Sequence, residues 1–526
     1  MDTRRMYGML VGLVMIGLIA ARPAAAQEAQ LGQTTFPTSG DAEAQTAFME
    51  GLLLLHSFEY PDARAAFQEA QQIDPDFAMA YWGEAMTHNH PLWFRQDAEA
   101  ARAALNDLAP TPEARLAKAP TEREKDYLRA VHILYGDGTK QARDDAYAEF
   151  MGTLAARYPD DLDAQAFHAL AILGTSHDGR DFRTYMRAAA IVEEVFDQNP
   201  QHPGAAHYLI HSYDDPVHAP LGLRPARVYA DIAPAAAHAL HMPSHIFTAL
   251  GMWDRSVEMN QRSWQASVDR MKEQELSIAA RSYHALWWLA YGQLQQGRYD
   301  AARATLGTVD DALEQQKAGT HRYHFVRMRA AYLVDTQDWT HPVTDVEVDH
   351  EQLGLTDIAL DQFAMGWHVL EQEGPEAAQR VLDALRSRMA DADESSDAAE
   401  VMALELDALI RQAQGQSDQA VARMEEATTR ADAMSLTYGP PIPVKPSHEL
   451  FGDLLLALNR PAEAQAQYRK ALDRAPKRAR SLLGLARAAS QAGDAETAQE
   501  AAATLRAIWN DADPSVREAL QTALSV

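Results

Sequence analysis

The chain lacks cysteine altogether, contains only 8% aromatic residues and carries far fewer basic than acidic residues. Without cysteine there can be no disulfide, thiolate nucleophile, iron–sulfur cluster or cysteine-bound zinc. Any metal must therefore be bound by His, Asp or Glu. Lys and Arg number 47 against 75 Asp and Glu, which gives a formal net charge of −28 over 526 residues. Such an excess repels nucleic-acid phosphates, so no nucleic-acid partner is expected.

Long apolar runs are also missing after the first 26 residues, so no membrane span is expected in the mature chain. Residues 1–26 have the three parts of a secretory signal peptide. Arg4 and Arg5 precede an apolar run from Gly8 to Ala21, and an A-x-A cleavage site ends at Ala26. The apolar run is shorter than the roughly 20 residues that cross a bilayer. We expect a periplasmic or secreted protein after cleavage near Ala26, with residues 27–40 as a flexible linker.

Six residues with the spacing of a tetratricopeptide repeat occur twice. The first copy is Gly51, Leu54, Ala63, Phe67, Ala70 and Pro75, and the second is Gly452, Leu455, Ala464, Tyr468, Ala471 and Pro476. In this repeat small residues let two antiparallel helices approach, an aromatic residue fills the gap, and proline ends the second helix. The pattern predicts an all-α tetratricopeptide-repeat solenoid.

One stretch interrupts the helical periodicity. Residues 336–356 contain a short β-branched run and lose the helical spacing. We therefore expect an N-terminal array at 41–335, a linker at 336–356 and a C-terminal array at 357–526.

Histidine is concentrated in one segment, with seven of the 20 between residues 202 and 245. His207 and His211 form an i,i+4 pair, and so do His241 and His245, so the members of each pair project from one helix face. The offset from 207 to 241, and from 211 to 245, is 34 residues, which is the repeat period. The pairs therefore occupy equivalent positions in consecutive repeats, where first helices line the concave groove, and His238 lies one turn before the second pair.

Imidazole and carboxylate ligands without sulfur suit Zn²⁺, Ni²⁺, Cu²⁺, Fe²⁺ or Mn²⁺. We expect His207, His211, His241 and His245, with His238, to bind one such divalent metal. Asp214 and Asp215 follow the first pair and are candidates for a further ligand or a catalytic base. Two other interpretations stay open: a polar groove whose histidines contact a bound peptide, and histidines with a packing role.

Repeat counting also places further residues on the concave surface. They are expected to line the ligand groove: Trp82, Met86, Asn89 and His90 near the N-terminus, and His284, Trp287 and Tyr291 beside the histidine cluster.

Three segments resemble a large family of exported bacterial tetratricopeptide-repeat proteins. They are Ala80–Ala85 (AYWGEA), His202–His211 (HPGAAHYLIH) and His238–Ile246 (HALHMPSHI). The resemblance covers roughly residues 40–330 and implies an all-α solenoid, but it supplies no reaction. Family members often have a second histidine where this chain has Trp287.

Two functions from different classes remain open. The first is an exported scaffold that binds a peptide, protein segment or small ligand in its concave groove, with or without a histidine-bound divalent metal. The second is a metal-dependent, hydrolase-like enzyme built on His207, His211, His241 and His245. The chain has no glycine-rich phosphate loop, G-x-S-x-G elbow or H-E-x-x-H helix, which favours the scaffold.

Overall fold

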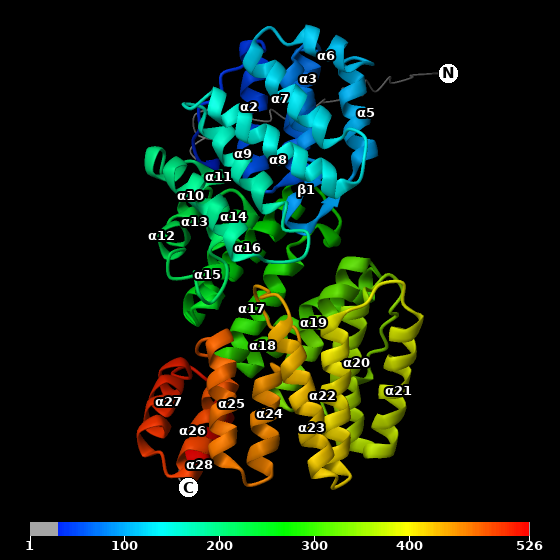
Figure 1. The fold of residues 1–526 in the computed structure, drawn as a ribbon, viewed down its shortest axis with the longest axis vertical. Coiled ribbons are helices and arrows are strands. Elements are labelled where there is room, and N and C mark those ends of the chain that lie inside the picture. Colours follow the sequence, from blue (N-terminus) through cyan, green and yellow to red (C-terminus); the bar gives the residue numbers. More distant parts are fainter. Residues whose placement is uncertain (1–29, 525–526) are drawn as a thin grey trace, which may run out of the picture.

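A computed structural model of the chain describes residues 30–524, whose regular secondary structure is almost entirely helical (Figure 1). This confirms the all-α prediction. Within these residues the two strands, β1 (Asn89–His90) and β2 (Arg95–Gln96), form one short antiparallel pair around the 3-10 helix η1 (Pro91–Trp93). None of the described helices is long and apolar enough to cross a membrane. The expected signal peptide lies outside the described residues.

The helices of the first half run from α2 to α16. They are α2 (Ala42–His56), α3 (Tyr60–Ile73), α4 (Ala78–Met86), α5 (Ala98–Leu108), α6 (Pro112–Lys118), α7 (Glu122–Leu134), α8 (Lys140–Arg157), α9 (Leu162–Leu173), α10 (Phe182–Gln198), α11 (Pro203–Ser212), α12 (Leu223–Ala226), α13 (Tyr229–Ile232), α14 (Ala237–His241), α15 (Pro243–Ala249) and α16 (Trp253–Glu273).

The second half continues from α17 to α28. Its helices are α17 (Tyr283–Gln295), α18 (Tyr299–Gln315), α19 (Gly319–Thr336), α20 (Leu355–Glu373), α21 (Pro375–Asp391), α22 (Asp397–Ala413), α23 (Ser417–Ala433), α24 (Ser447–Ala457), α25 (Pro461–Arg474), α26 (Ala479–Ala492), α27 (Ala495–Ile508) and α28 (Pro514–Leu524), with short 3-10 turns η2 (Ile278–Ala280) and η3 (Pro342–Asp345).

The helix pairs pack as the repeat spacing predicts. Phe67 lies between two glycines: a Cβ on Gly51 would come within 2.9 Å of its ring, and one on Gly83 within 2.3 Å. Tyr468 lies in the same way between Gly452 and Gly484, where an added Cβ would come within 2.7 and 2.2 Å of it. The missing side chains thus create the space that each aromatic ring fills.

The buried side chains form two hydrophobic cores that meet at α16. The first core runs from Leu31 to Met259, and the second from Val257 to Val516. The expected boundary at 336–356 is therefore misplaced. That stretch is irregular, but Trp339 and Val343 are buried in the second core, and α19 packs directly against α20. A loss of helical periodicity marks a non-helical connection, whereas a domain boundary requires a break in burial.

The described part of the expected linker at 27–40 is also packed. Leu31 and Phe36 are 4% and 2% exposed, and the Phe36 ring stacks on Trp82 with 5.8 Å between centroids. The backbone N–H of Gln33 donates to the carbonyl of Gln201 at 2.9 Å. Residues 30–40 therefore belong to the first core.

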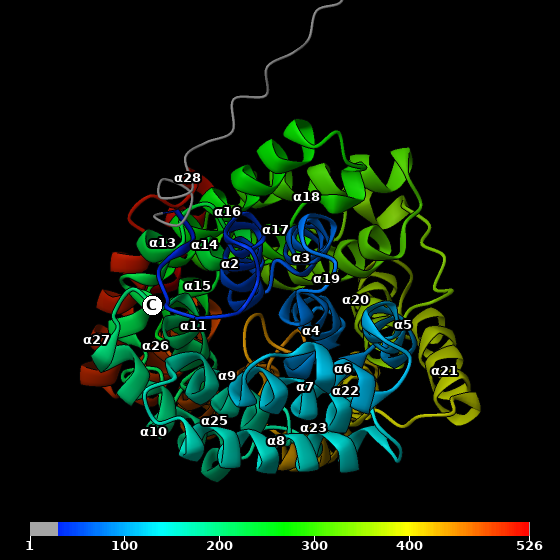
Figure 2. The same ribbon diagram turned by 90° about the horizontal axis from the view of Figure 1, so that it is seen from above.

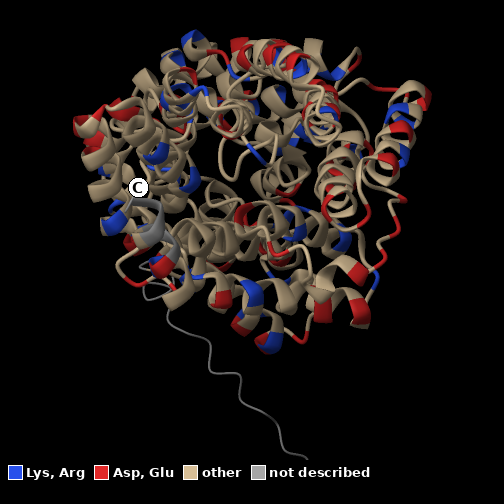
Figure 3. Cartoon of the chain, turned by 90° about the horizontal axis from the view of Figure 1, so that it is seen from below, with Lys and Arg blue, Asp and Glu red and all other residues tan. Residues whose placement is uncertain are grey.

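The solenoid brings its C-terminal helices back onto its middle. The indole N–H of Trp253 donates to the carbonyl of Lys477 at 3.1 Å, and that of Trp509 donates to the carbonyl of Gln295 at 3.0 Å. Seen from above, helices of both halves surround a common axis, and the segment between α23 and α24 runs toward it (Figure 2). Acidic and basic residues are interspersed over the outer helices (Figure 3). The segment at the axis lies next to the histidine cluster.

Candidate metal centre

Four helices bring six histidines together in two groups of three. Triad A consists of His207 and His211 on α11 and His238 on α14, and triad B consists of His241 on α14, His245 on α15 and His284 on α17. In each triad one nitrogen from each ring lies within 4.8 Å of the others. The structure thus brings together all five histidines that the sequence predicts as ligands, and His284, expected in the groove wall, completes triad B.

Local helix geometry explains both i,i+4 pairs. In α11 the Nε2 atoms of His207 and His211 are 3.1 Å apart. Pro243 lacks an N–H and begins a new helix, α15. The backbone nevertheless stays helical at Met242, with φ −53° and ψ −37°, so the helical register continues across the break. His241 and His245 therefore still face each other, with 3.0 Å between their Nε2 atoms.

Three histidines each donate the Nδ1–H to a hydrogen-bond acceptor that fixes the orientation of the ring. The Nδ1–H of His207 donates to the carbonyl of His56 at 2.7 Å, because a carbonyl oxygen can only accept. The Nδ1–H of His245 donates to Asp214 Oδ2 at 2.5 Å. Such partners set the tautomer of a metal-binding histidine and leave its Nε2 lone pair directed at the ion.

His241 is held in the same tautomer. Its Nδ1–H donates to Asn260 Oδ1 at 2.6 Å, and Asn260 Nδ2 donates to the carbonyl of Ser256 at 2.8 Å, which fixes the amide orientation. His241 and His245 are both hydrogen-bonded through Nδ1, so both Nε2 atoms carry lone pairs. Two lone pairs 3.0 Å apart repel each other unless a cation, either a metal ion or a proton, lies between them.

Burial keeps five of the six imidazoles neutral. It lowers the pKa of His207 to about 3. Burial, reinforced by neighbouring imidazoles, holds the pKa values of His211, His238, His241 and His284 well below the usual value of 6.5. Neutral imidazole is the form that binds a metal, so protons do not compete for these ligands at neutral pH.

The two carboxylates proposed as base or ligand are both engaged elsewhere. Asp214 is 2% exposed and accepts the hydrogen bond from His245. Asp215 is 1% exposed, accepts from Arg180 Nη2 at 2.9 Å, and is 2.9 Å from His218 Nδ1. Asp214 is thus placed to orient a histidine, and Asp215 to hold the loop after α11.

The other expected groove residues are dispersed. Trp82 is 1% exposed and lies in the first core, where Phe36 covers it, so it does not line an open groove. Met86 and Asn89 are buried nearby, and only His90 is half-buried, stacked on Tyr60 with 4.0 Å between centroids.

On the other side of the cluster, Trp287 and Tyr291 are also buried, at 6% and 4% exposed. The Arg327 guanidinium lies 4.8 Å from the Trp287 ring, and Arg478 Nη1 donates to the Tyr291 hydroxyl at 3.2 Å. Neither residue belongs to a triad, but the Trp287 ring lies edge-on to His284 with 6.0 Å between centroids, and Tyr291 lines a pocket beside triad B.

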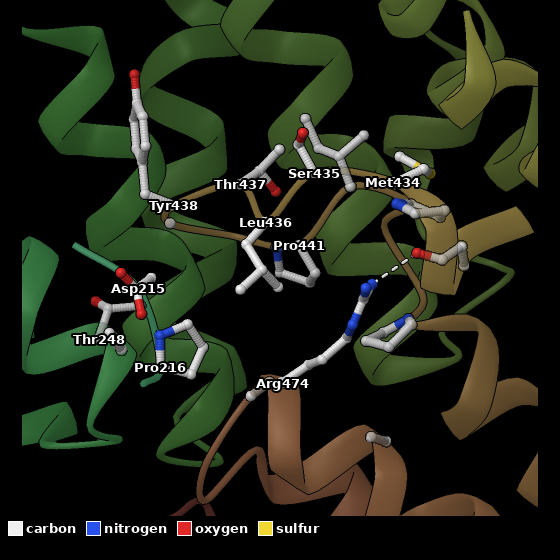
Figure 4. A pocket seen from close by; sticks show the side chains of 18 of the residues that line it. Asp215, Pro216, Thr248, Met434, Ser435, Leu436, Thr437, Tyr438, Pro441 and Arg474 are labelled. Carbon is white, nitrogen blue, oxygen red and sulfur yellow. Dashed lines mark hydrogen bonds between the residues drawn. The ribbon is translucent and has the colours of Figure 1, made fainter. Parts of the chain in front are cut away.

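A proline-rich loop at 434–446, between α23 and α24, covers triad B. The Tyr438 ring lies 5.2 Å from the His245 ring, and Trp288 stacks on His245 at 4.3 Å. A pocket of about 120 Å³ lies beside this contact, with Asp215 and Thr248 on one wall and Leu436 on the other (Figure 4). Four prolines between 440 and 446 mark this segment as non-helical in the sequence, but they do not indicate where it packs.

A third cluster lies behind triad A. His56, Asp163 and His202 are fully buried, and Asp163 Oδ1 is 2.8 Å from His56 Nε2 and 3.4 Å from His202 Nε2. The other His56 ring nitrogen is hydrogen-bonded to the Tyr208 hydroxyl at 2.9 Å. The cluster joins α2, α9 and α11, and so it positions the His56 carbonyl that orients His207.

Comparison with known proteins identifies a tetratricopeptide repeat at residues 446–478, which includes α24 and α25. Among curated proteins none matches the chain. Similar solved structures include the Cut9–Hcn1 hetero-tetramer of the APC/C (11% identity, covering 94% of this chain and 78% of that one, TM-score 0.33). Yeast Tom70 has 13% identity over 92% and 94% of the two chains with a TM-score of 0.30. The human IFIT1 dimer with PPP-AAAA has 13% identity over 91% and 98%, with a TM-score of 0.36.

The chain is therefore an all-α solenoid that contains a tetratricopeptide repeat.

Proposed function

We propose that this protein is an exported tetratricopeptide solenoid whose histidine cluster binds divalent transition metal and presents it to a peptide, protein segment or small ligand. The observation that carries the metal-binding proposal is the pair of Nε2 lone pairs on His241 and His245, 3.0 Å apart. A bound cation turns this repulsion into two coordination bonds. The Nδ1 partners already hold both rings in the orientation that such an ion needs.

The ligand atoms of the triads restrict which metal ions are suitable. Each triad offers three imidazoles and no carboxylate. Imidazole suits Zn²⁺, Cu²⁺, Ni²⁺ and Fe²⁺, whereas Mn²⁺ favours carboxylate and water ligands. Among the five metals that the sequence suggests, Mn²⁺ is therefore the least suitable.

The hydrolase-like alternative has less support. A metal-activated water needs a base that is free to take its proton. Asp214 is bound to His245 and Asp215 to Arg180, so neither carboxylate is free to do this. Binding and presentation of metal are therefore proposed ahead of turnover.

Elemental analysis of untagged protein purified from the periplasm tests the metal-binding proposal. We expect near-stoichiometric transition metal in the native protein and a clear loss in the variant His241→Ala/His245→Ala. The control variant His88→Ala/His177→Ala changes two half-buried histidines outside the triads and should keep its metal. Far-UV circular dichroism checks that each protein is helical. A native protein that holds no metal and takes up none on titration with Zn²⁺ or Cu²⁺ would overturn the proposal.

A further inference from the structure

We infer that the six histidines form a two-metal centre, with one ion on triad A and a second on triad B. This inference rests on the proposed metal binding and deepens it, because it assigns each triad its own ion.

The two triads have the same construction. Each takes an i,i+4 pair from one repeat and a third histidine from the next helix on the concave side: His238 joins the pair on α11, and His284 joins the pair on α14 and α15. The pairs are 34 residues apart, whereas the third histidines, His238 and His284, are 46 residues apart, so the repeats differ in length. Both triads nevertheless combine a pair from one repeat with a histidine from a later helix, so the same arrangement occurs twice along the solenoid.

The donor atoms of the described residues gather in threes rather than in one set of six. Ring centroids within the pairs are 4.8 Å apart for His207 and His211 and 4.9 Å apart for His241 and His245. Ring centroids alone do not separate the triads, because His211 and His245 are 5.7 Å apart across the triads and His245 and His284 are 6.4 Å apart within triad B. The grouping rests on the ring nitrogens, which lie within 4.8 Å of one another inside each triad. Metal–imidazole bonds are about 2.0–2.1 Å, so donors of one ion are separated by no more than about 4.2 Å. The compact triads approach that limit, whereas a single ion would have to draw the two pairs together.

Each triad also has enough ligands to bind a metal ion without the other triad. Three imidazoles fill three positions of a four-coordinate ion and leave the fourth open for a ligand. The members of the i,i+4 pairs are at most 5% exposed, whereas His238 and His284 are half-buried. The Trp93 ring, 40% exposed, lies 6.3 Å from His238. Ions therefore reach the centre, and a ligand reaches the open positions, past these two histidines.

The number of zinc ions bound per chain distinguishes a one-metal from a two-metal centre. The protein is stripped with a chelator, loaded with excess Zn²⁺, desalted and analysed for zinc and protein. We expect two ions in the native chain, one in His207→Ala/His211→Ala, one in His241→Ala/His245→Ala and none when all four are replaced. The control variant His88→Ala/His177→Ala should hold two.

A spectroscopic measurement on the native chain avoids dependence on the folding of the variants. With saturating Cu²⁺, two ions in adjacent triads should give an electron paramagnetic resonance spectrum with dipolar broadening and a half-field signal. One ion per chain with an isolated axial spectrum would overturn the two-metal centre and leave the proposed metal binding intact. Absence of any bound Zn²⁺ or Cu²⁺ would overturn the metal-binding function itself.

Discussion

The buried carboxyl group of Glu405 offers a quantitative test of the second core. Glu405 lies on α22, is fully buried, and accepts a hydrogen bond from Ser447 Oγ at 2.6 Å, while its Oε2 has no partner. Burial raises the pKa of Glu405 to about 8, although Ser447 and Lys445 oppose the shift. Ser447 begins α24, directly after the loop that covers triad B, so this contact anchors one end of that loop.

The sign of the pH dependence follows from proton uptake. Between pH 4.5 and 8 the folded chain holds a proton on Glu405 that the unfolded chain releases, so stability falls as pH rises through this range. At about 1.4 kcal/mol for each pH unit, the loss is about 3 kcal/mol at pH 7 and about 5 kcal/mol above pH 8. The substitution Glu405→Gln keeps the shape and the acceptor for Ser447 but cannot ionise, and it should remove this loss.

Urea unfolding at pH 5, 7 and 9, at constant ionic strength and with EDTA in every sample, measures the effect. Native and Glu405→Gln proteins should be similarly stable at pH 5 and should diverge at pH 9, where the variant unfolds at a higher urea concentration. The control Glu394→Gln changes an exposed glutamate just before α22 and should follow the native curve. Parallel curves for the native and Glu405→Gln proteins from pH 5 to 9 would refute the argument.

Two further substitutions test the proposed metal centre and the buried ion pairs of Arg478 in the second core. Asp214→Asn removes the anionic acceptor of the His245 Nδ1–H, so metal affinity, measured by competition with a chromophoric chelator, should fall about 10- to 100-fold; unchanged affinity would contradict the role assigned to Asp214. Arg478→Met leaves the buried carboxylate of Asp335 without its cation and leaves Glu449 with Lys445 as its remaining cation, so the free energy of unfolding should fall by about 3 kcal/mol; a melting temperature equal to that of the native protein would show that these ion pairs are not needed.

The histidine positions show which parts of a site the sequence can predict. The i,i+4 spacing is a property of one helix, and the 34-residue offset is a property of the repeat, so both pairs could be placed before any tertiary contact was known. Counting one more repeat brought His284 to the same surface. It could not show that His284 turns toward His241, whose ring is 4.6 Å away, because that depends on how α17 packs.

Counting of repeat positions could not predict contacts between segments that are distant in the sequence. Repeat position assigns Trp82 to the concave face, but Phe36, from a segment before the first helix pair, covers it. Tyr438 reaches His245 from the C-terminal half because α24 to α26 pack back against the middle of the solenoid. Periodicity describes each helix pair and its neighbours, whereas these contacts depend on the closure of the whole superhelix.

The free-energy cost of burying the histidine cluster links the proposed metal binding to folding. Burying a polar group without a partner costs free energy, and the pKa of His207, about 3, shows how strongly its surroundings disfavour the charged form. Proton binding between His241 and His245 would relieve their lone-pair repulsion only by placing a charge beside His241, whose pKa burial holds well below its usual value. A metal ion shares its charge over three ligands and satisfies all their lone pairs at once. Because the unfolded chain has no preformed triad, the free energy of the proposed metal binding would stabilise the folded solenoid. Under the proposed function, the ions at these six histidines would belong to the stable form of the protein.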